Sequence, residues 1–274
     1  MKIKLPRQSR HLGSNKKYCD EPIVVTDSWG LRAVYYPWEA EELKDIISRD
    51  FYKPEFLAIQ KLVKRGDTTF DVGANVGIFS ALLSRQVGSE GSVYAFEPVQ
   101  ETFCRLLENL GLNHCQNVSA NQMALSSKPG SLTMNVFEPK YSAWNSFGHP
   151  QFGEVKPINT EKVKTISLDK FCKERQIGKI NFLKIDVEGF EKDVLQGTAD
   201  LLQKGAVDVL SFEVSGIPLK GSGGTVRDSF DLLKSFGYNS YRYNSGANKF
   251  TGPVTDSSDD YQNFYSSRRK LEEL

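Results

Sequence analysis

A short glycine-containing segment, FDVGANVGIF at residues 70–79, has residue types that could bind a ligand. Gly73 permits backbone angles that a side chain would block, and Gly77 would let a ligand approach the start of the next helix. The dinucleotide fingerprint G-x-G-x-x-G would need two further glycines, where this chain has Asn75 and Ile78. A G-x-x-x-x-G-K-[ST] phosphate loop is absent as well. The segment therefore argues against a pyrophosphate ligand, and an ordinary tight turn is the alternative to a binding loop.

Two acidic residues accompany this segment. Asp71 lies just before the glycine turn, where a carboxylate would repel a pyrophosphate but could accept a hydrogen bond from an ammonium group, such as the one on S-adenosylmethionine. Glu97 ends a predicted strand and stands 20 residues after Gly77, where an acid accepts hydrogen bonds from both ribose hydroxyls of an adenosine. Further along, Met123 and Ala124 could pack against the adenine ring, and core packing explains them equally well.

A second group of charges lies in the segment FLKIDVEGFE at residues 182–191. Lys184, Asp186 and Glu188 alternate along an extended stretch, so their side chains point the same way. Three charges on one face of a buried strand are costly unless they lie at its open end and serve a ligand. A purely structural ion pair between Lys184 and one carboxylate is the alternative. Glu213, at the end of the next predicted strand, is placed to join them.

The elements that must position these residues alternate between strand and helix from Thr68 onward. This order implies right-handed crossovers and a mainly parallel, doubly wound α/β sheet. Ligands on such a sheet bind beyond the carboxyl ends of the strands. Strands are predicted at 68–72, 92–96, 117–121, 181–185, 207–212, 240–243 and 262–265, and helices at 76–86, 99–110, 189–196 and 226–236.

Two regions depart from this order. Residues 1–65 form a predicted N-terminal extension to a main domain at 66–274. The extension comprises a polar tail to about residue 20, a hairpin at 23–26 and 31–36, and helices at 39–48 and 54–64. The stretch 126–164 predicts an inserted hairpin that turns at 128–130, followed by an aromatic and polar loop at 141–150. A long loop of this kind over an α/β sheet is typical of a lid or substrate loop, less often of a mere connection.

The composition narrows the classes of partner and compartment. With 35 basic and 34 acidic residues the formal charge is +1, which gives no support to nucleic acid or an anionic membrane as partner. The four cysteines form no C-x-x-C pair, as expected for reduced thiols in a cytoplasmic protein. No apolar run is long enough to span a bilayer, and the basic N-terminus lacks the apolar core of a secretory signal. A homo-oligomer is compatible with these features.

Five segments resemble the FkbM family of methyltransferases, in the family's order and roughly its spacing across residues 66–213. The sequence KIDVEGFE is the most specific of them. The first 50 or so residues and the last 60 or so carry no motif of the family. The matching segments are 70–79, 95–98, 165–169, 183–197 and 212–213.

The resemblance implies a Rossmann-like, seven-stranded class I methyltransferase sheet and methyl transfer from S-adenosylmethionine to oxygen. Family members act on hydroxyls of sugars in polysaccharides and glycolipids, or on hydroxyls of macrolide natural products. Carried across by position, Glu97 would bind the ribose and Asp186 would line the cofactor side of the active site. The cofactor loop would comprise Asp71, Gly73, Asn75 and Gly77.

A sugar hydroxyl is a poor nucleophile and needs a base or a metal to take its proton. Asp186 and Glu188 are candidates for either role, with Glu213 as a third oxygen ligand and Mg²⁺ as a fitting ion. His149 on the aromatic loop is an alternative base, although a lone loop histidine is more often solvated. Tyr52 and Glu55 are candidates to close over the methionine end of the cofactor. The predicted acceptor platform comprises Tyr141, Trp144, Asn145 and Ser146, and a loop folded onto the protein's own core is the alternative.

Two other functions fit the same fold less well. An NAD-dependent oxidoreductase fails the glycine fingerprint and lacks the Tyr-x-x-x-Lys pair of short-chain reductases in the expected place. A non-catalytic adenosine-binding module would be expected to lose Asp71 or Glu97, and both are present. Methylation of protein or nucleic acid stays open, but no Asn-Pro-Pro-Tyr motif follows the fourth strand, which favours oxygen over nitrogen as the acceptor atom.

Overall fold

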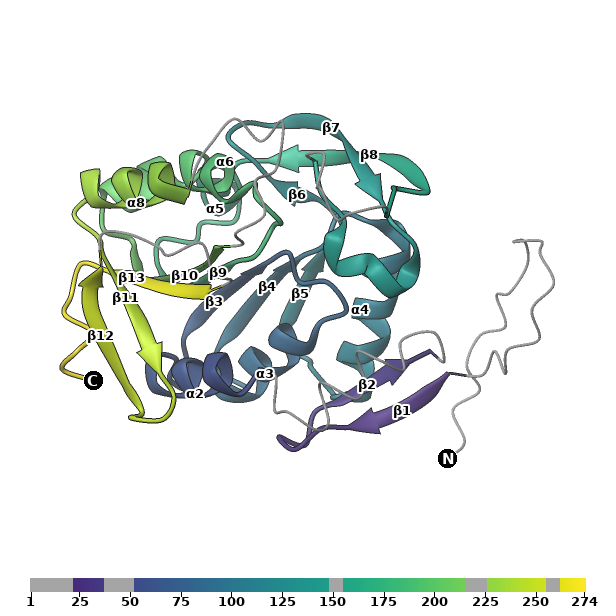
Figure 1. The fold of residues 1–274 in the computed structure, drawn as a ribbon, viewed down its shortest axis with the longest axis horizontal. Coiled ribbons are helices and arrows are strands. Elements are labelled where there is room, and N and C mark those ends of the chain that lie inside the picture. Colours follow the sequence, from purple (N-terminus) through teal and green to yellow (C-terminus); the bar gives the residue numbers. More distant parts are fainter. Residues whose placement is uncertain (1–21, 37–51, 148–154, 215–225, 255–261) are drawn as a thin grey trace.

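The computed structural model describes residues 22–36, 52–147, 155–214, 226–254 and 262–274. Its centre is an eight-stranded sheet in the order β12-β11-β13-β10-β9-β3-β4-β5 (Figure 1). The five strands from β10 to β5 are parallel, whereas β13 runs antiparallel to both of its neighbours. The strands are β3 (Thr68–Val72), β4 (Ser92–Phe96), β5 (Val118–Asn121), β9 (Ile180–Ile185), β10 (Val207–Val214), β11 (Asn239–Asn244), β12 (Lys249–Val254) and β13 (Gln262–Ser267).

This order confirms the predicted doubly wound α/β fold, with one strand more than expected. The additional strand is β12, which pairs only with β11 at the edge of the sheet. Gly252 and Pro253 within it concealed it from the sequence pattern, because proline cannot donate a hydrogen bond and is tolerated mainly in edge strands.

Helices cover both faces of the sheet, and each face has its own apolar core. On one face α2 (Lys53–Leu62) and α3 (Ile78–Val87) pack on side chains such as Phe182, Val209 and Tyr265. On the other face Phe70 and Phe212 pack against residues of α5, α6, α7 and α8. Figure 1 shows the two helical layers on opposite sides of the strands. The remaining helices are α4 (Gln100–Leu112), α5 (Leu168–Glu174), α6 (Glu191–Gln196), α7 (Ala199–Gln203) and α8 (Val226–Ser235).

The alternation of side chains places charges on the α2/α3 face at the carboxyl ends of the central strands. Lys184 follows buried Phe182 on the same face of β9, and Glu213 follows Val209 in the same way on β10. Asp71 is the corresponding residue of β3, since it pairs with Lys184 in register. Strands buried on both faces are normally apolar, so these charges mark the end of the sheet where chemistry is expected.

The predicted insertion is present as a small separate sheet. The hairpin predicted to turn at 128–130 is wrong in its pairing, because the strands on either side of that turn, β6 (Ala124–Leu125) and β7 (Gly130–Val136), are not neighbours in the sheet. Both pair instead with β8 (Asn159–Ile166), β6 in parallel and β7 antiparallel. A 3₁₀ helix, η2 (Pro139–Trp144), follows β7.

The N-terminal hairpin is also present, as β1 (Ile23–Thr26) and β2 (Arg32–Tyr35). It is held to α4, where the Oδ1 atoms of Asn113 and Asn109 accept hydrogen bonds from the backbone N–H groups of Arg32 and Val34, both at 2.9 Å. The tail and the helix predicted at 39–48 lie outside the described residues. The division at residue 65 stays a prediction, since α2 shares the core of the main sheet. No helix in the described part of the chain is long and apolar enough to cross a membrane.

Candidate active site

The loop between β3 and α3 is held tightly against two neighbouring strands. Its residues Gly73, Asn75 and Gly77 all have positive φ angles, of 80°, 47° and 90°. The N–H of Gly73 donates to the carbonyl oxygen of Phe96 at 3.1 Å. An ideal Cβ on Gly73 would lie only 1.8 Å from the carbonyl oxygen of Asp186. Only glycine therefore fits at position 73, because of both its φ angle and the close approach of the β9 end.

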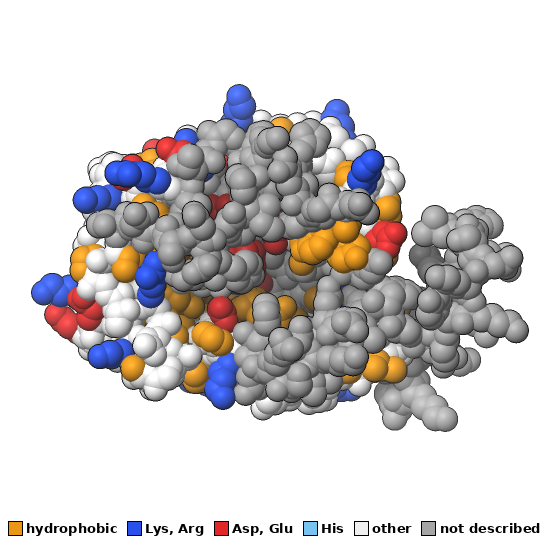
Figure 2. Space-filling view, in the orientation of Figure 1, with side chains coloured by type: hydrophobic (Ala, Val, Ile, Leu, Met, Phe, Trp, Pro, Cys, Tyr) orange, Lys and Arg blue, Asp and Glu red, His pale blue; other side chains and the backbone are white. Residues whose placement is uncertain are grey.

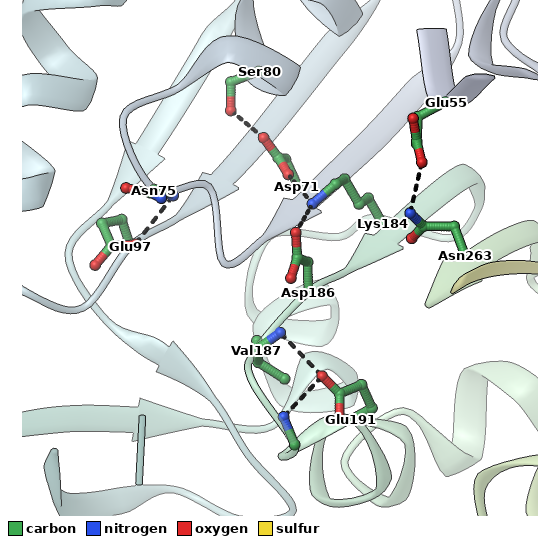
Figure 3. Close-up of polar contacts among 11 residues, drawn as sticks. Glu55, Asp71, Asn75, Ser80, Glu97, Lys184, Asp186, Val187, Glu191 and Asn263 are labelled. Carbon is green, nitrogen blue, oxygen red and sulfur yellow. Dashed lines mark hydrogen bonds and ion pairs between the residues drawn. The ribbon is translucent and has the colours of Figure 1, made fainter. Parts of the chain in front are cut away.

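Glu97 is fixed by the backbone of this loop and of its own strand end. Its Oε2 accepts from the N–H of Asn75 at 3.1 Å (Figure 3). Its Oε1 accepts from the N–H of Val99 at 3.0 Å. The side chain is buried, and burial raises its pKa to about 7 despite the two N–H donors. The lone pairs that the backbone leaves unused are available to a ligand hydroxyl.

A cavity opens beside Glu97, and it has the chemistry of an adenosine site. One wall is apolar, with Ala124, Leu125, Met134 and Phe147, and the far end carries the carboxylates of the β9 turn. An apolar slot next to a buried carboxylate suits a purine ring with its ribose, whereas the acids would repel a pyrophosphate. Five predicted cofactor residues line this cavity, namely Gly73, Asn75, Glu97, Ala124 and Asp186.

Three other predicted cofactor residues do not line the cavity. Met123 packs against the large core cluster, and Gly77 begins α3, where a Cβ would meet the side chain of Leu106 at 2.5 Å. Asp71 is fully buried behind the loop, and its Oδ2 accepts from Ser80 Oγ at 2.6 Å. The structure therefore does not present Asp71 to a ligand ammonium. Burial raises the pKa of this carboxyl.

Lys184 is the buried cation between two of these acids. Its Nζ lies 2.6 Å from Asp186 Oδ2 and 4.0 Å from Asp71 Oδ1 (Figure 3). The same atom lies 4.5 Å from the centre of the Phe79 ring. Burial disfavours the charge, but Asp186 and Asp71 outweigh it and raise the pKa of Lys184 above its ordinary value. The structure therefore shows the ion pair that the alternative reading expected. A role of these charges toward a ligand stays a prediction.

The three predicted metal ligands come together. Oxygen atoms of Asp186, Glu188 and Glu213 lie within 4.8 Å of one another. Glu188 has a φ of 50°, which turns the chain back toward β10. Burial, with the charges of Asp186 and Glu191 nearby, raises the pKa of Glu188. In Figure 2 acidic side chains gather near the centre of the face shown, beside hydrophobic ones.

Glu191 fixes the turn that carries these acids, a role that the sequence analysis did not assign to it although it ends the segment KIDVEGFE. Its Oε1 accepts from the N–H groups of Val187 and Gly189, at 3.2 and 3.1 Å (Figure 3). Burial raises the pKa of Glu191 to about 7. The sequence offered one signal for this role, since an acid shortly after the Glu188-Gly189 turn can cap the backbone N–H groups of that turn.

Neither of the two residues predicted to close over the cofactor, Tyr52 and Glu55, is among the lining residues of the cavity beside Glu97. Glu55 Oε1 accepts from Asn263 Nδ2 at 2.9 Å, which links α2 to β13. Burial raises the pKa of Glu55. The positive charge of Lys184 opposes this rise, and the negative charge of Asp186 adds to it. Tyr52 instead packs in an aromatic cluster, 5.9 Å from the Phe56 ring centre.

A family model described as the methyltransferase FkbM domain matches residues 71–240. The chain belongs to the FkbM methyltransferase family. It is 34% identical over 137 residues to the hexuronic acid methyltransferase AglP of Haloferax volcanii, covering 50% of this chain and 52% of AglP. It is 31% identical over 165 residues to the 31-O-demethyl-FK506 methyltransferase FkbM of Streptomyces tacrolimicus, covering 50% of this chain and 62% of that protein. The chain thus spans little more than half the length of these relatives.

Among solved structures the chain is similar to a SAM-dependent methyltransferase from Aquifex aeolicus, with a TM-score of 0.45 and 14% identity. That match covers 82% of this chain and 96% of the other. A SAM-dependent O-methyltransferase from Thermotoga maritima gives a TM-score of 0.41 and 13% identity, covering 90% of this chain and 77% of the other.

In this FkbM-family chain one of the four predicted acceptor residues, Asn145, lines the adenosine cavity, whereas Tyr141, Trp144 and Ser146 are not among its lining residues. Ser142, Ala143 and Phe147 of the same loop line it as well. Asn145 Oδ1 accepts from the N–H of Phe137 at 2.9 Å, and buried Ser146 pairs with Asn135 through the backbone. Tyr141 and Trp144 stack on each other with ring centres 4.5 Å apart. Their role toward an acceptor stays a prediction, and His149 lies outside the described residues.

Proposed function

We propose that this chain is an S-adenosylmethionine-dependent O-methyltransferase whose acceptor is a hydroxyl of a sugar, a glycan or a glycosylated or polyketide natural product. The observation that carries the proposal is the cavity beside Glu97, which is lined by apolar side chains and by the Asp186 and Glu188 carboxylates, with Glu213 next to these two acids. The apolar lining suits an adenosine, and the carboxylates suit a hydroxyl that must lose its proton. The names of the matched relatives include a hexuronic acid and a 31-O-demethyl acceptor, which supports oxygen as the acceptor atom.

When bound, S-adenosylmethionine supplies an electrophilic methyl group on a positively charged sulfur. The acceptor oxygen forms its bond to the methyl carbon as the carbon–sulfur bond breaks, and the hydroxyl proton passes to a carboxylate of the chain. Asp186 and Glu188 lie at the cavity end where this proton is released. Lys184 holds Asp186 through Oδ2 and Glu191 holds the turn, so the carboxylates are oriented before the substrate arrives.

We further propose that Asp186, Glu188 and Glu213 hold a divalent cation such as Mg²⁺. Three carboxylates with oxygens within 4.8 Å of one another form a hard oxygen donor set that fits this ion. A cation there would relieve the repulsion among the acids and lower the pKa of a bound hydroxyl. Activity is expected to disappear in EDTA and to return with added Mg²⁺. Full turnover by metal-free protein would contradict the cation.

The test of the main proposal is transfer of labelled methyl from S-adenosylmethionine to polysaccharide and glycolipid fractions of the host cell. Wild-type protein is expected to label a glycan fraction, and Glu97→Ala is expected to abolish the label. Glu90→Ala, which removes an exposed acid, is the matched control and is expected to behave as wild type. If label is absent while adenosylhomocysteine still binds, the glycan assignment is wrong. If the glycan is still labelled by Glu97→Ala, the assignment of the cofactor site to the cavity beside Glu97 is wrong.

A further inference from the structure

A second pocket opens at the same edge of the sheet, on the side of the acidic group away from Glu97. Glu55 and Pro54 of α2, Tyr243 at the end of β11, and Asn263 and Tyr265 of β13 are among its lining residues. Asn263 is the register partner of Glu213 in the β10–β13 pair, so the pocket begins one strand beyond the acidic group. It does not share a lining residue with the adenosine cavity.

The floor of this pocket has an unused hydrogen-bond acceptor. Asn263 holds Glu55 through Oε1, whereas Oε2 is buried and has no hydrogen-bond partner among the described residues. A buried carboxylate oxygen without a donor is costly in free energy. A ligand hydroxyl is the kind of donor that would satisfy it, because the neighbouring Asn263 amide already fixes the other oxygen.

Two aromatic rings, those of Tyr243 and Tyr265, line the pocket beside polar residues such as Arg242 and Thr251. Tyr265 is buried with its ring centre 6.5 Å from that of Tyr243, at nearly right angles. Tyr243 is half-buried, so one part of its ring stays accessible. Aromatic walls around a few fixed polar groups are the usual lining of a small-molecule site, and they suit a ligand with apolar C–H faces and polar edges.

We propose that this pocket, named here the acceptor pocket, binds a sugar ring of the methyl acceptor. A ring hydroxyl donates to Glu55 Oε2 while the ring lies against Tyr243. Asp186 and Glu188 line the adenosine cavity, and Asn263 of the acceptor pocket is the register partner of Glu213, so a sugar held here extends another hydroxyl toward the carboxylates. The inference rests on the proposed function, for which it names the place and the chemistry of acceptor recognition.

The experiment combines a binding arm and a transfer arm. Saturation-transfer NMR would measure binding of methyl β-D-glucoside and methyl β-D-glucuronide to adenosylhomocysteine-loaded protein. We compare wild type with Tyr243→Ala and Glu55→Gln. Lys249→Ala, an exposed neighbour on β12 that does not line the pocket, is the matched control. The transfer arm measures methylation of the glycan fraction against glycan concentration. Adenosylhomocysteine affinity reports whether each variant is folded.

Wild type and Lys249→Ala are expected to bind at least one sugar, and both pocket variants to lose the signal. Methylation at low glycan concentration is expected to fall about tenfold or more in both, as for loss of one or two good contacts, with adenosylhomocysteine affinity unchanged. No sugar binding to wild type, or equal binding to all four proteins, would overturn the acceptor pocket, as would unchanged methylation in both pocket variants. Sugar bound through the pocket without any methyl transfer would leave the pocket standing and refute the proposed function.

Discussion

The two ends of the binding groove differ in how their carboxylates are held. At the adenosine end, both oxygens of Glu97 accept from backbone N–H groups, and the cavity wall is apolar. At the other end, Glu55 Oε2 and Asp71 Oδ1 are buried without a hydrogen-bond partner among the described residues. The adenosine end is therefore preorganised by the backbone, whereas the acidic end has an acceptor on Glu55 that a substrate hydroxyl would satisfy and a buried Asp71 that faces only the charge of Lys184.

The largest expected effect on adenosylhomocysteine binding comes from the contact that joins the two ends. Gly73→Ala would force a Cβ against the Asp186 carbonyl oxygen, so the loop and the β9 turn must separate. We expect adenosylhomocysteine affinity to fall by about 100-fold or more, a loss of roughly 3 kcal/mol. Isothermal titration calorimetry with adenosylhomocysteine measures this loss of affinity.

Gly66→Ala is the matched control for this substitution. Gly66 has a similar φ of 84° but nothing within 4 Å of its added Cβ, so only the backbone cost of about 1–2 kcal/mol applies. That variant should be less stable but should bind adenosylhomocysteine normally. Equal affinity losses in the two variants would show that the Gly73–Asp186 contact has no special role.

The acidic end depends on Lys184. Lys184→Met would leave Asp71 and Asp186 buried without their cation, and we expect the free energy of unfolding to fall by about 3–5 kcal/mol. Lys179→Met breaks an exposed ion pair with Asp208 and should cost less than about 1 kcal/mol. Urea denaturation of both variants measures the difference. Similar losses would mean that the buried pair does not hold the acidic end together.

Titration of Glu97 tests the preorganised end. Burial raises its pKa to about 7, and the carboxylate form is the one that accepts from two ribose hydroxyls. Adenosylhomocysteine affinity should therefore fall as the pH drops below about 7, by up to about tenfold per unit. Affinity of Glu97→Gln should be weaker and, in this range, much less dependent on pH. A wild-type profile as flat as that of the variant would contradict a ribose contact at Glu97.

The raised pKa of Glu97 makes the stability of the unliganded protein change with pH in the opposite direction to its ligand affinity. The folded state binds the Glu97 proton more tightly than the unfolded state between pH 4.5 and about 7. Its stability should therefore rise as the pH falls through that window, relative to Glu97→Gln, which denaturation at several pH values measures.

The smallest effect is expected at the apolar wall. Met134→Ala should remove part of the slot and weaken adenosylhomocysteine binding by a few-fold, about 1 kcal/mol, with little change for the acceptor. Leu132→Ala alters the same strand at an exposed position outside the cavity and should have no effect. Titration of both variants with adenosylhomocysteine compares them directly. Equal affinities would show that Met134 does not contribute to the adenosine slot.

The two ends also differ in how far the sequence could predict them. The β3–α3 loop, Glu97 and the Asp186–Glu188–Glu213 group follow from local spacing and from the shared edge of parallel strands, and the structure brings them together. The sequence placed Asp71 just before the glycine turn but could not show that its side chain is fully buried there.

Long-range contacts set the limit of sequence prediction. Glu55 and Asn263 are 208 positions apart, so no motif could pair them. The predicted acceptor loop was recognised as aromatic and polar, but the wall that it forms depends on how it folds over β7, which tertiary packing decides.

The most direct test of the central claim is to titrate adenosylhomocysteine and NAD separately into wild-type protein and Glu97→Ala. The structure predicts that wild type binds adenosylhomocysteine but not NAD, and that Glu97→Ala binds adenosylhomocysteine at least about tenfold more weakly. Binding of NAD without adenosylhomocysteine would contradict the assignment and favour an oxidoreductase on the same fold.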